Sequence, residues 1–355
     1  MSFGTTLKTV LEEAHMPATL FPDEAWDTCE PADVGIDAGK LVRARQWLDA
    51  NAPENGYRFL LVRHGRVAAE WNSGIDAQAY TPIASAAKSL YSSVLGAAVE
   101  RDVLASADER VVAHYPEMMD VPEGRGPKEG RYAFEKDREI TFRQLISNTS
   151  GYMKPGEAPG EVFHYQTYGM NVLTHSLAKV HGRYDVSDPE GSAGFSTLIE
   201  EYLARPIGAE PRYTLSNFAL QPDARLDIFG YYCQVHTRPV DFARLGWLWL
   251  NGGRWDGEQV VPEAWLREAT ATAPAILANS PEEDHRYGMG FWTNDNDRLW
   301  PGLPTSGFSA SGAGGHYCSV FPEQGMVVVQ NPGPYAGFDG RGNPELLRLV
   351  LDAAE

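Results

Sequence analysis

The pattern of hydrophobic and polar positions predicts a chain that opens with a helix and a pair of strands. Residues 37–50 place apolar side chains at helical spacing, which favours an amphipathic helix. Residues 58–63 and 66–71 are short β-rich runs on either side of a two-residue turn, which is typical of a hairpin. Residues 85–101 are rich in Ala and Leu and contain no proline, so they predict a longer helix.

The middle of the chain predicts several helices, and its last quarter changes to strands. Residues 120–139 are charged and rich in Gly and Pro, which indicates an exposed loop. The expected middle helices lie at 140–147, 172–180, 195–204, 240–251 and 262–271. The expected late strands lie at 287–293, 315–321 and 326–330, before a closing helix at 345–354.

This order of elements predicts an α/β (α+β) fold. An antiparallel sheet assembled from both chain ends would be flanked by helices, with a helical lobe inserted in the middle. We interpret residues 1–30 as an N-terminal extension and residues 31–355 as one two-lobed domain. The α/β lobe would comprise about 31–112 and 225–355, and the mainly helical lobe about 113–224.

Composition narrows the partners and the compartment. A net charge of −18 repels nucleic acid and anionic membranes, so neither is an expected partner, and halotolerance stays open. Three widely spaced cysteines and no His/Asp/Glu cluster at ligand spacing predict no disulfide framework, metal or other cofactor. Residues 1–21 lack a signal-like apolar run, and no stretch approaches the roughly 20 apolar residues of a membrane span. We therefore expect a cytoplasmic protein; its oligomeric state stays open.

The candidate chemistry begins with Ser85-Ala-Ala-Lys88 at the start of a predicted helix. Residues three apart share one helix face, so the hydroxyl and the ammonium can meet. Free backbone N–H groups at a helix start favour developing negative charge near Ser85. Lysine acts as a base only where burial or nearby cations lower its pKa. Taken alone, this pattern equally fits a surface Ser and Lys on an ordinary helix.

Two further segments add weaker candidates. Tyr165 lies in an aromatic, irregular segment and could relay a proton from Ser85 to a leaving group, although a buried aromatic cluster explains it as well. Residues 309–316 are rich in Gly and Ser and precede a predicted strand. A backbone N–H from this strand could complete an oxyanion hole with that of Ser85, although the segment also fits a plain Gly-rich turn.

Together and in this order, the three motifs resemble the serine β-lactamase and penicillin-binding-protein-like hydrolases. Within that family they resemble the branch that holds class C β-lactamases, D-Ala-D-Ala carboxypeptidases and family VIII esterases. The segments 61–65, 140–151 and 241–246 share the resemblance, which covers roughly residues 30–350. It implies the α/β fold with a helical lobe.

The resemblance assigns roles residue by residue. Ser85 matches the nucleophile and Lys88 the base that activates it. Tyr165 matches the second-motif tyrosine, which shares the base role and protonates the leaving group. Thr167 stands where the family usually has Asn or Ser, so the second motif is altered at this position.

The third motif departs from the family pattern. It aligns with Ala310-Ser311-Gly312, so an alanine replaces the usual Lys or His, and Ala313 would supply the second oxyanion N–H. Alanine cannot bind the carboxylate of a β-lactam or of a peptide C-terminus. His316 offers a nearby cation, or instead faces the pocket wall or the sheet.

These residues predict a serine hydrolase that forms an acyl-enzyme on small esters or amides without a free carboxylate. The residues expected to contact substrate are Thr167, Ser311, Gly312, His316 and Trp292. Trp292 suits an apolar acyl or alcohol group, or belongs to the core. The alternatives are a β-lactamase, D-aminopeptidase or D,D-carboxypeptidase-type enzyme, and a non-catalytic binding or sensor protein of the same fold.

Overall fold

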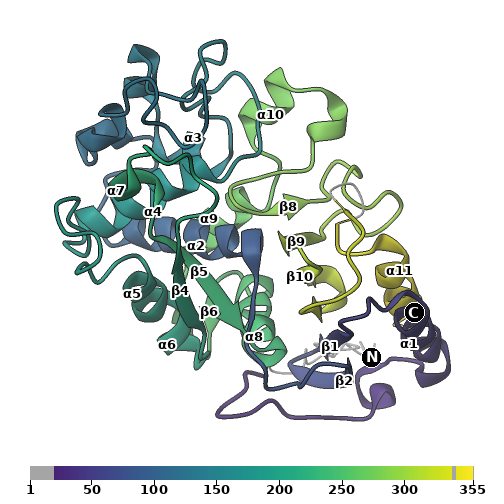
Figure 1. The fold of residues 1–355 in the computed structure, drawn as a ribbon. Helices are drawn as coiled ribbons and strands as arrows, with labels where there is room; N and C mark the ends of the chain where they lie inside the picture. Colours follow the sequence, from purple (N-terminus) through teal and green to yellow (C-terminus); the bar gives the residue numbers. More distant parts are fainter. Residues whose placement is uncertain (1–19, 338–340, 355) are drawn as a thin grey trace, which may run out of the picture.

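The computed structural model describes residues 20–337 and 341–354, and its centre is a six-stranded antiparallel sheet (Figure 1). The strand order is β2-β1-β11-β10-β9-β8, so the two ends of the chain meet where β1 pairs with β11. These strands are β1 (Tyr57–Arg63), β2 (Arg66–Ser73), β8 (Trp292–Thr293), β9 (Phe308–Gly312), β10 (His316–Phe321) and β11 (Met326–Gln330). The predicted sheet of both chain ends is confirmed.

Helices cover both faces of this sheet because its strands are apolar on both sides. Phe59 and Leu61 of β1 share a core with α1 and α11, whereas Leu60 and Val62 face the larger core that contains α2 and α8. The helices are α1 (Ala38–Asn51), α2 (Ala87–Glu100), α8 (Pro239–Leu250), α9 (Glu263–Ala269), α10 (Pro274–Asn279) and α11 (Pro344–Asp352). In Figure 1, α1 and α11 lie together at one edge of the molecule.

A mainly helical part surrounds α2, away from the six-stranded sheet (Figure 1). Its helices are α3 (Phe142–Ile146), α4 (Tyr168–Val180), α5 (Ser196–Ile199), α6 (Arg205–Ile207) and α7 (Leu226–Phe229). A second antiparallel sheet joins β3 (Thr81–Pro82), β5 (Tyr232–Thr237) and β4 (Arg212–Ser216), and a hairpin pairs β6 (Arg254–Trp255) with β7 (Glu258–Gln259). Because β4 pairs with β5, this small sheet joins segments on either side of the lobe boundary predicted near residue 224.

Several expected elements differ from the structure, and two of the differences concern how the chain runs. The helix expected at 195–204 is longer, because α5 runs through a π-helical turn at Glu200–Ala204 into α6. The strand expected at 287–293 is wrong except for β8. Gly290 has φ +83° and packs so closely on α2 that a Cβ would lie 2.6 Å from the Lys88 carbonyl oxygen, so the chain turns there.

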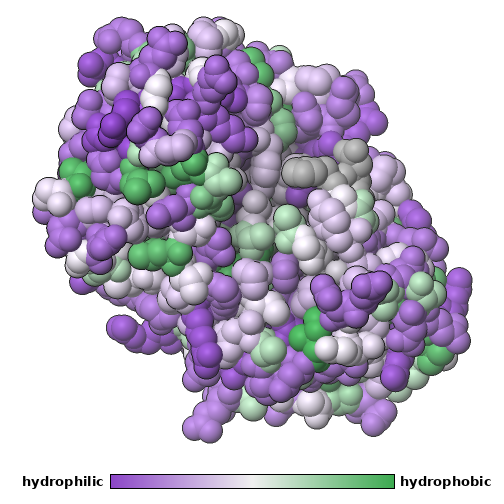
Figure 2. Space-filling view, viewed as in Figure 1, coloured by the Kyte–Doolittle hydropathy of each residue, from purple (hydrophilic) through white to green (hydrophobic). Residues whose placement is uncertain are grey.

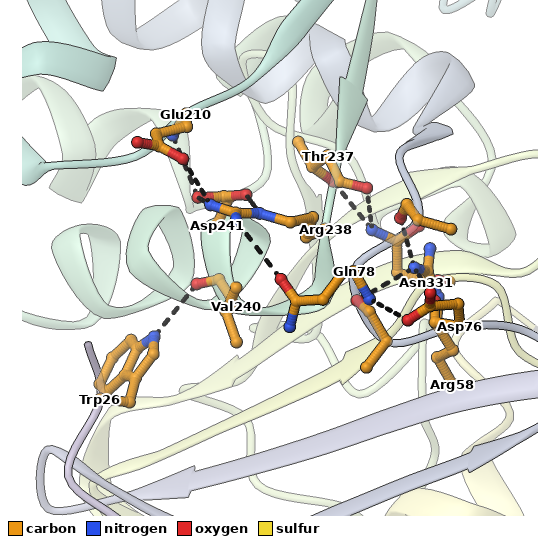
Figure 3. A network of polar contacts seen from close by, with 12 residues as sticks. Trp26, Arg58, Asp76, Gln78, Glu210, Thr237, Arg238, Val240, Asp241 and Asn331 are labelled. Atoms are coloured by element: carbon orange, nitrogen blue, oxygen red, sulfur yellow. Dashed lines mark hydrogen bonds and ion pairs between the residues drawn. The ribbon is translucent and has the colours of Figure 1, made fainter. Parts of the chain in front are cut away.

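The described part of the N-terminal extension lies against α8. The Trp247 indole donates a hydrogen bond to the Leu20 carbonyl at 2.9 Å, and the Trp26 indole donates to the Val240 carbonyl at 3.1 Å (Figure 3). Residues 1–19, the rest of the predicted extension, lie outside the described residues.

The face of the molecule shown in Figure 2 is mostly hydrophilic, in keeping with the strongly acidic composition. Apolar side chains gather around β4 and α7, where Leu215, Phe218 and Leu226 are exposed. Within residues 20–337 and 341–354, no helix is both long and apolar enough to cross a bilayer.

Candidate active site

Ser85 lies in a tight turn that leads into α2. The turn is a short 3₁₀ helix at Ala84–Ala86, so the predicted helix over 85–101 begins two residues late, at Ala87. Ala84 has φ +48°, a left-handed conformation that is costly for a residue other than glycine and is common at functional sites. The Ile83 N–H donates to the Val235 carbonyl at 2.9 Å, which fixes the turn to β5.

Lys88 contacts Ser85 directly. The Lys88 ammonium donates a hydrogen bond to the Ser85 hydroxyl oxygen at 2.7 Å, as expected for residues three apart at the start of a helix. The Lys88 side chain is buried, while Ser85 stays partly exposed. The pair therefore combines a nucleophile open to a substrate with a cation that bulk water does not reach.

Tyr165 completes this cluster from the segment before α4. The Lys88 ammonium lies 4.8 Å from the centroid of the Tyr165 ring. Burial alone would raise the pKa of Tyr165, but the Lys88 charge, hydrogen bonds with Ser85 and Lys88, and the Arg341 charge outweigh it. The net effect lowers the pKa of the Tyr165 phenol, which favours the phenolate, the form that can accept a proton.

Asn148 holds the Tyr165 segment in place, and sequence reasoning gave it no role. Its carbonyl accepts from the His164 N–H at 2.9 Å and its side-chain oxygen from the Gln166 N–H at 3.0 Å, so both neighbours of Tyr165 are fixed. Its side-chain amide donates to the Tyr287 hydroxyl at 3.1 Å. Asn148 has φ +57°, a conformation that asparagine tolerates well. The signal that could have found it is the Asn-Thr-Ser-Gly run at residues 148–151, which lies in the segment 140–151 that shares the family resemblance.

The predicted third motif lies directly against the Ser85 turn. A Cβ at Gly312, the last residue of β9, would lie 2.0 Å from the Ile83 carbonyl oxygen, so only glycine fits there. Ala310 is buried in β9, and Ser311 is buried with its hydroxyl donating to the Ser309 hydroxyl at 3.2 Å. Ala313 is exposed in the turn after β9, at the end of the strand that meets the Ser85 turn. Its oxyanion role and the substrate contacts of Ser311 and Gly312 stay predictions.

His316 does not supply the missing positive charge in the folded protein, and its substrate contact stays a prediction. Its Nδ1 lies 3.0 Å from the Asn331 side-chain oxygen, which also accepts from the Thr81 hydroxyl. Burial, together with the nearby charge of Arg58, lowers the pKa of His316 to about 4, so the ring is neutral at neutral pH. Asn331 also donates to Thr237 at 2.8 Å, and this network joins both sheets (Figure 3).

The two remaining predicted substrate contacts are Trp292 and Thr167. Trp292 is buried in β8, with its ring centroid 5.3 Å from that of Tyr165. Thr167 is partly exposed directly before α4, and its carbonyl accepts from the Met170 N–H at 2.8 Å. The structure therefore brings Trp292 into the cluster, and the substrate contact of Thr167 stays a prediction.

Two residues that sequence reasoning missed also face Tyr165. The Tyr287 ring lies edge-on, 5.6 Å from the Tyr165 ring, and is fully buried. The guanidinium carbon of Arg341 lies 3.6 Å from the Trp292 ring centroid and 5.5 Å from that of Tyr165. Neither residue carries a local sequence signal. Among the residues that the structure describes, no three His, Cys, Asp or Glu side chains gather as a metal site needs.

The fold is of the β-lactamase and transpeptidase type. A family model described as beta-lactamase matches residues 48–330, so the chain belongs to the beta-lactamase family. The resemblance and the fold predicted from the sequence are thereby confirmed. A comparison with curated proteins gives no match.

Solved structures with this fold come from several kinds of protein. A penicillin-binding protein homolog from Caulobacter crescentus is 16% identical, with TM-score 0.62, and the match covers 90% of this chain and 99% of that one. A family VIII carboxylesterase is 17% identical, with TM-score 0.61 and coverage of 90% and 98%. EstCE1, a hydrolase with promiscuous acyltransferase activity, is 15% identical, with TM-score 0.62 and coverage of 89% and 98%. At these identities the likeness shows the fold alone.

Proposed function

We propose that the protein is a serine hydrolase that forms an acyl-enzyme at Ser85 and acts as a carboxylesterase or amide hydrolase. The observation that carries the proposal is the 2.7 Å contact between the Lys88 ammonium and the Ser85 hydroxyl, beside a tyrosine whose pKa is lowered. A hydroxyl held between a buried cation and a proton acceptor is the arrangement that nucleophilic catalysis requires.

In the first half-reaction, Ser85 Oγ bonds to the substrate carbonyl carbon while its proton moves to the Tyr165 phenolate oxygen. The Lys88 ammonium stabilises this exchange, so Tyr165 takes the larger share of the base role that the sequence assigned to Lys88. The backbone N–H groups of Ser85 and Ala313 bind the carbonyl oxygen as it becomes negative. The bond to the leaving alcohol or amine then breaks, and Tyr165 returns the proton to the leaving oxygen or nitrogen.

In the second half-reaction, water replaces the leaving group. Tyr165 accepts a proton from the water molecule while the water oxygen bonds to the acyl carbon. The bond between the acyl carbon and Ser85 Oγ breaks, Oγ regains its proton from Tyr165, and the carboxylic acid leaves. An alcohol or amine in place of water would give acyl transfer by the same steps.

The substrate we propose is a small ester or amide without a free carboxylate. Ala310 offers no cation at the third motif, and His316 beside it is neutral because its pKa is lowered to about 4. The aromatic rings of Trp292 and Tyr287 beside Tyr165 suit an apolar acyl or alcohol group.

A β-lactam- or peptide-directed activity is the second candidate, and Arg341 is the observation that favours it. Its guanidinium carbon lies 5.5 Å from the Tyr165 ring centroid. Arg341 is thus a cation near Tyr165 that belongs to none of the three motifs. Nitrocefin turnover separates the two candidates. Hydrolysis of nitrocefin faster than of p-nitrophenyl esters would replace the esterase proposal with this one.

Covalent labelling tests the proposal directly. A fluorophosphonate probe should label wild-type protein at Ser85, and p-nitrophenyl acetate should release p-nitrophenol in a burst followed by slower turnover. Ser85→Ala should abolish both, whereas Ser73→Ala, at an exposed serine of β2, should leave both unchanged. Labelling at another residue, or none in the wild type, would contradict the proposal.

A reducing, cytoplasmic setting is also proposed. Cys29, Cys233 and Cys318 are all free thiols, and burial raises the pKa of Cys233 to about 12, which makes it unreactive. Cell fractionation checks this, and recovery of the protein outside the cytoplasm would contradict it.

A further inference from the structure

Arg341 is a buried cation that belongs to none of the three motifs but lies beside Tyr165. It is 5% exposed, its guanidinium carbon lies 3.6 Å from the Trp292 ring centroid, and that ring packs on Tyr165. A guanidinium stacked on an aromatic ring keeps its positive charge. Because it is buried, little water screens that charge, so it acts strongly on neighbouring groups.

The backbone at residues 341–343 is anchored by hydrogen bonds, so the position of the Arg341 charge follows from the fold. The Trp300 indole donates to the Arg341 carbonyl at 2.6 Å, and the Gln330 side chain donates to the Gly342 carbonyl at 2.9 Å. The Asn343 amide donates to the Gln330 side-chain oxygen at 2.6 Å. These contacts fix the segment before α11 to the end of β11.

Several charged and titratable groups surround Tyr165, and among the residues that the structure describes only two of those closest to it carry a positive charge. They are Ser85 and Lys88 from the α2 side, Tyr232 from β5, Tyr287 from the segment before β8, and Arg341 from the segment before α11, with Arg286 farther out beside Trp292. The two tyrosines are buried and the pKa of each is raised, so both stay neutral. Any negative charge on Tyr165 is therefore balanced chiefly by Lys88 and Arg341.

We propose that Arg341 supplies the second positive charge that stabilises the Tyr165 phenolate. The inference rests on the proposed acyl-enzyme function and adds a positioning residue to it, since Arg341 acts through Tyr165 and not on the substrate. The third motif has alanine at position 310, and His316 after it is neutral. The second positive charge near Tyr165 therefore comes from a different segment of the chain, the one before α11.

The test is the pH dependence of Ser85 labelling by a fluorophosphonate. Without the charge at position 341, Tyr165 needs a higher pH to lose its proton. Arg341→Met should therefore move the acid limb of the labelling-rate profile up by about one pH unit, which makes labelling roughly tenfold slower on that limb. Arg341→Lys keeps the charge and should restore most of the rate. Arg348→Met, at an exposed arginine of α11, is the matched control and should leave the profile unchanged.

Two results would overturn the role of Arg341. One is an unshifted acid limb in a folded Arg341→Met protein whose Ser85 is still labelled. The other is an Arg341→Lys protein that behaves like Arg341→Met, because charge would then not be the property that matters. Circular dichroism of each variant identifies any loss of fold.

A measurement on the intact wild type keeps the inference testable if Arg341→Met does not fold. The ultraviolet difference spectrum between wild type and Tyr165→Phe should contain a phenolate band that titrates below the ordinary range of tyrosine. Absence of that band overturns the role of Arg341. If Ser85 is never labelled while the phenolate band is present, the proposed hydrolase function fails and the electrostatic role of Arg341 stands.

Discussion

The two walls of the candidate site are built in different ways. On the first wall, Ser85 and Lys88 are three residues apart at the start of α2, and one helical turn brings their side chains to 2.7 Å. The opposite wall brings together Gly312 of β9, Trp292 of β8 and Arg341 before α11, which meet only once the sheet has formed. Local geometry therefore places the nucleophile, whereas its electrostatic surroundings and substrate contacts depend on the whole fold.

The largest effect should come from removing the local cation. Lys88→Met deletes the group that contacts Ser85, and we expect acylation of Ser85 to fall by about 10³-fold or more. This loss exceeds the roughly tenfold effect expected for Arg341→Met, because Arg341 acts only through Tyr165. Stopped-flow measurement of the p-nitrophenol burst gives both values.

Lys40→Met is the matched control for Lys88→Met, since Lys40 is exposed on α1 and donates to the Asp352 carbonyl. Its acylation rate should match the wild type. If Arg341→Met proved more damaging than Lys88→Met, the ranking of the two walls would be reversed.

The close contact between β9 and the Ser85 turn should be nearly as sensitive to substitution. Gly312→Ala places a methyl group 2.0 Å from the Ile83 carbonyl oxygen, so β9 must move away from the Ser85 turn. We expect acylation to fall by about 10²-fold, because a displacement of this size disturbs the oxyanion geometry. The burst rate, together with thermal unfolding, measures the effect. Gly156→Ala, where nothing lies within 4 Å of the new methyl group, should be neutral, and equal effects at both glycines would contradict the close contact.

Substitutions at Asn148 test how firmly the segment that carries Tyr165 is held in position. Asn148→Ala removes the side-chain hydrogen bonds to Gln166 and Tyr287, so Tyr165 should sample more positions. We expect kcat to fall about tenfold and the free energy of unfolding to fall by about 1–3 kcal/mol. Asn148→Asp keeps the acceptor for the Gln166 N–H and should lose less kcat. Equal kcat losses in both variants would show that this acceptor does not position Tyr165.

What the sequence could predict follows the same division between local and distant contacts. The antiparallel sheet, most of the helices and the meeting of Ser85 with Lys88 were predictable because apolar periodicity and helical spacing act over a few residues. The resemblance placed Tyr165 near this pair, and the structure brings the three side chains together.

The sequence could not predict the contacts that tertiary packing creates. Arg341 follows a stretch with no motif, and only the anchoring of its backbone to Gln330 and Trp300 sets its charge beside Tyr165. The neutral state of His316 likewise depends on burial and on Asn331. The strand expected at 287–293 fails because the approach of Gly290 to α2 is a long-range constraint.

The smallest effect concerns His316 of β10, a buried neutral ring where one interpretation of the sequence expected a cation. The pKa of His316 is about 4 in the folded protein, against an ordinary value of 6.5. Between pH 4 and pH 6.5 this histidine is therefore protonated in the unfolded chain but not in the folded protein. Stability should therefore fall as pH decreases, by roughly 0.7 kcal/mol between pH 7 and pH 6 for this one group. His175, with its pKa also lowered to about 4 by burial, adds a similar amount. Urea unfolding at pH 7 and pH 6 should show that His316→Gln keeps about half of the pH dependence of stability that the two histidines cause together. An unchanged pH dependence in His316→Gln would mean that the pKa of His316 is not lowered by folding, so that His316 can carry a positive charge in the folded protein after all.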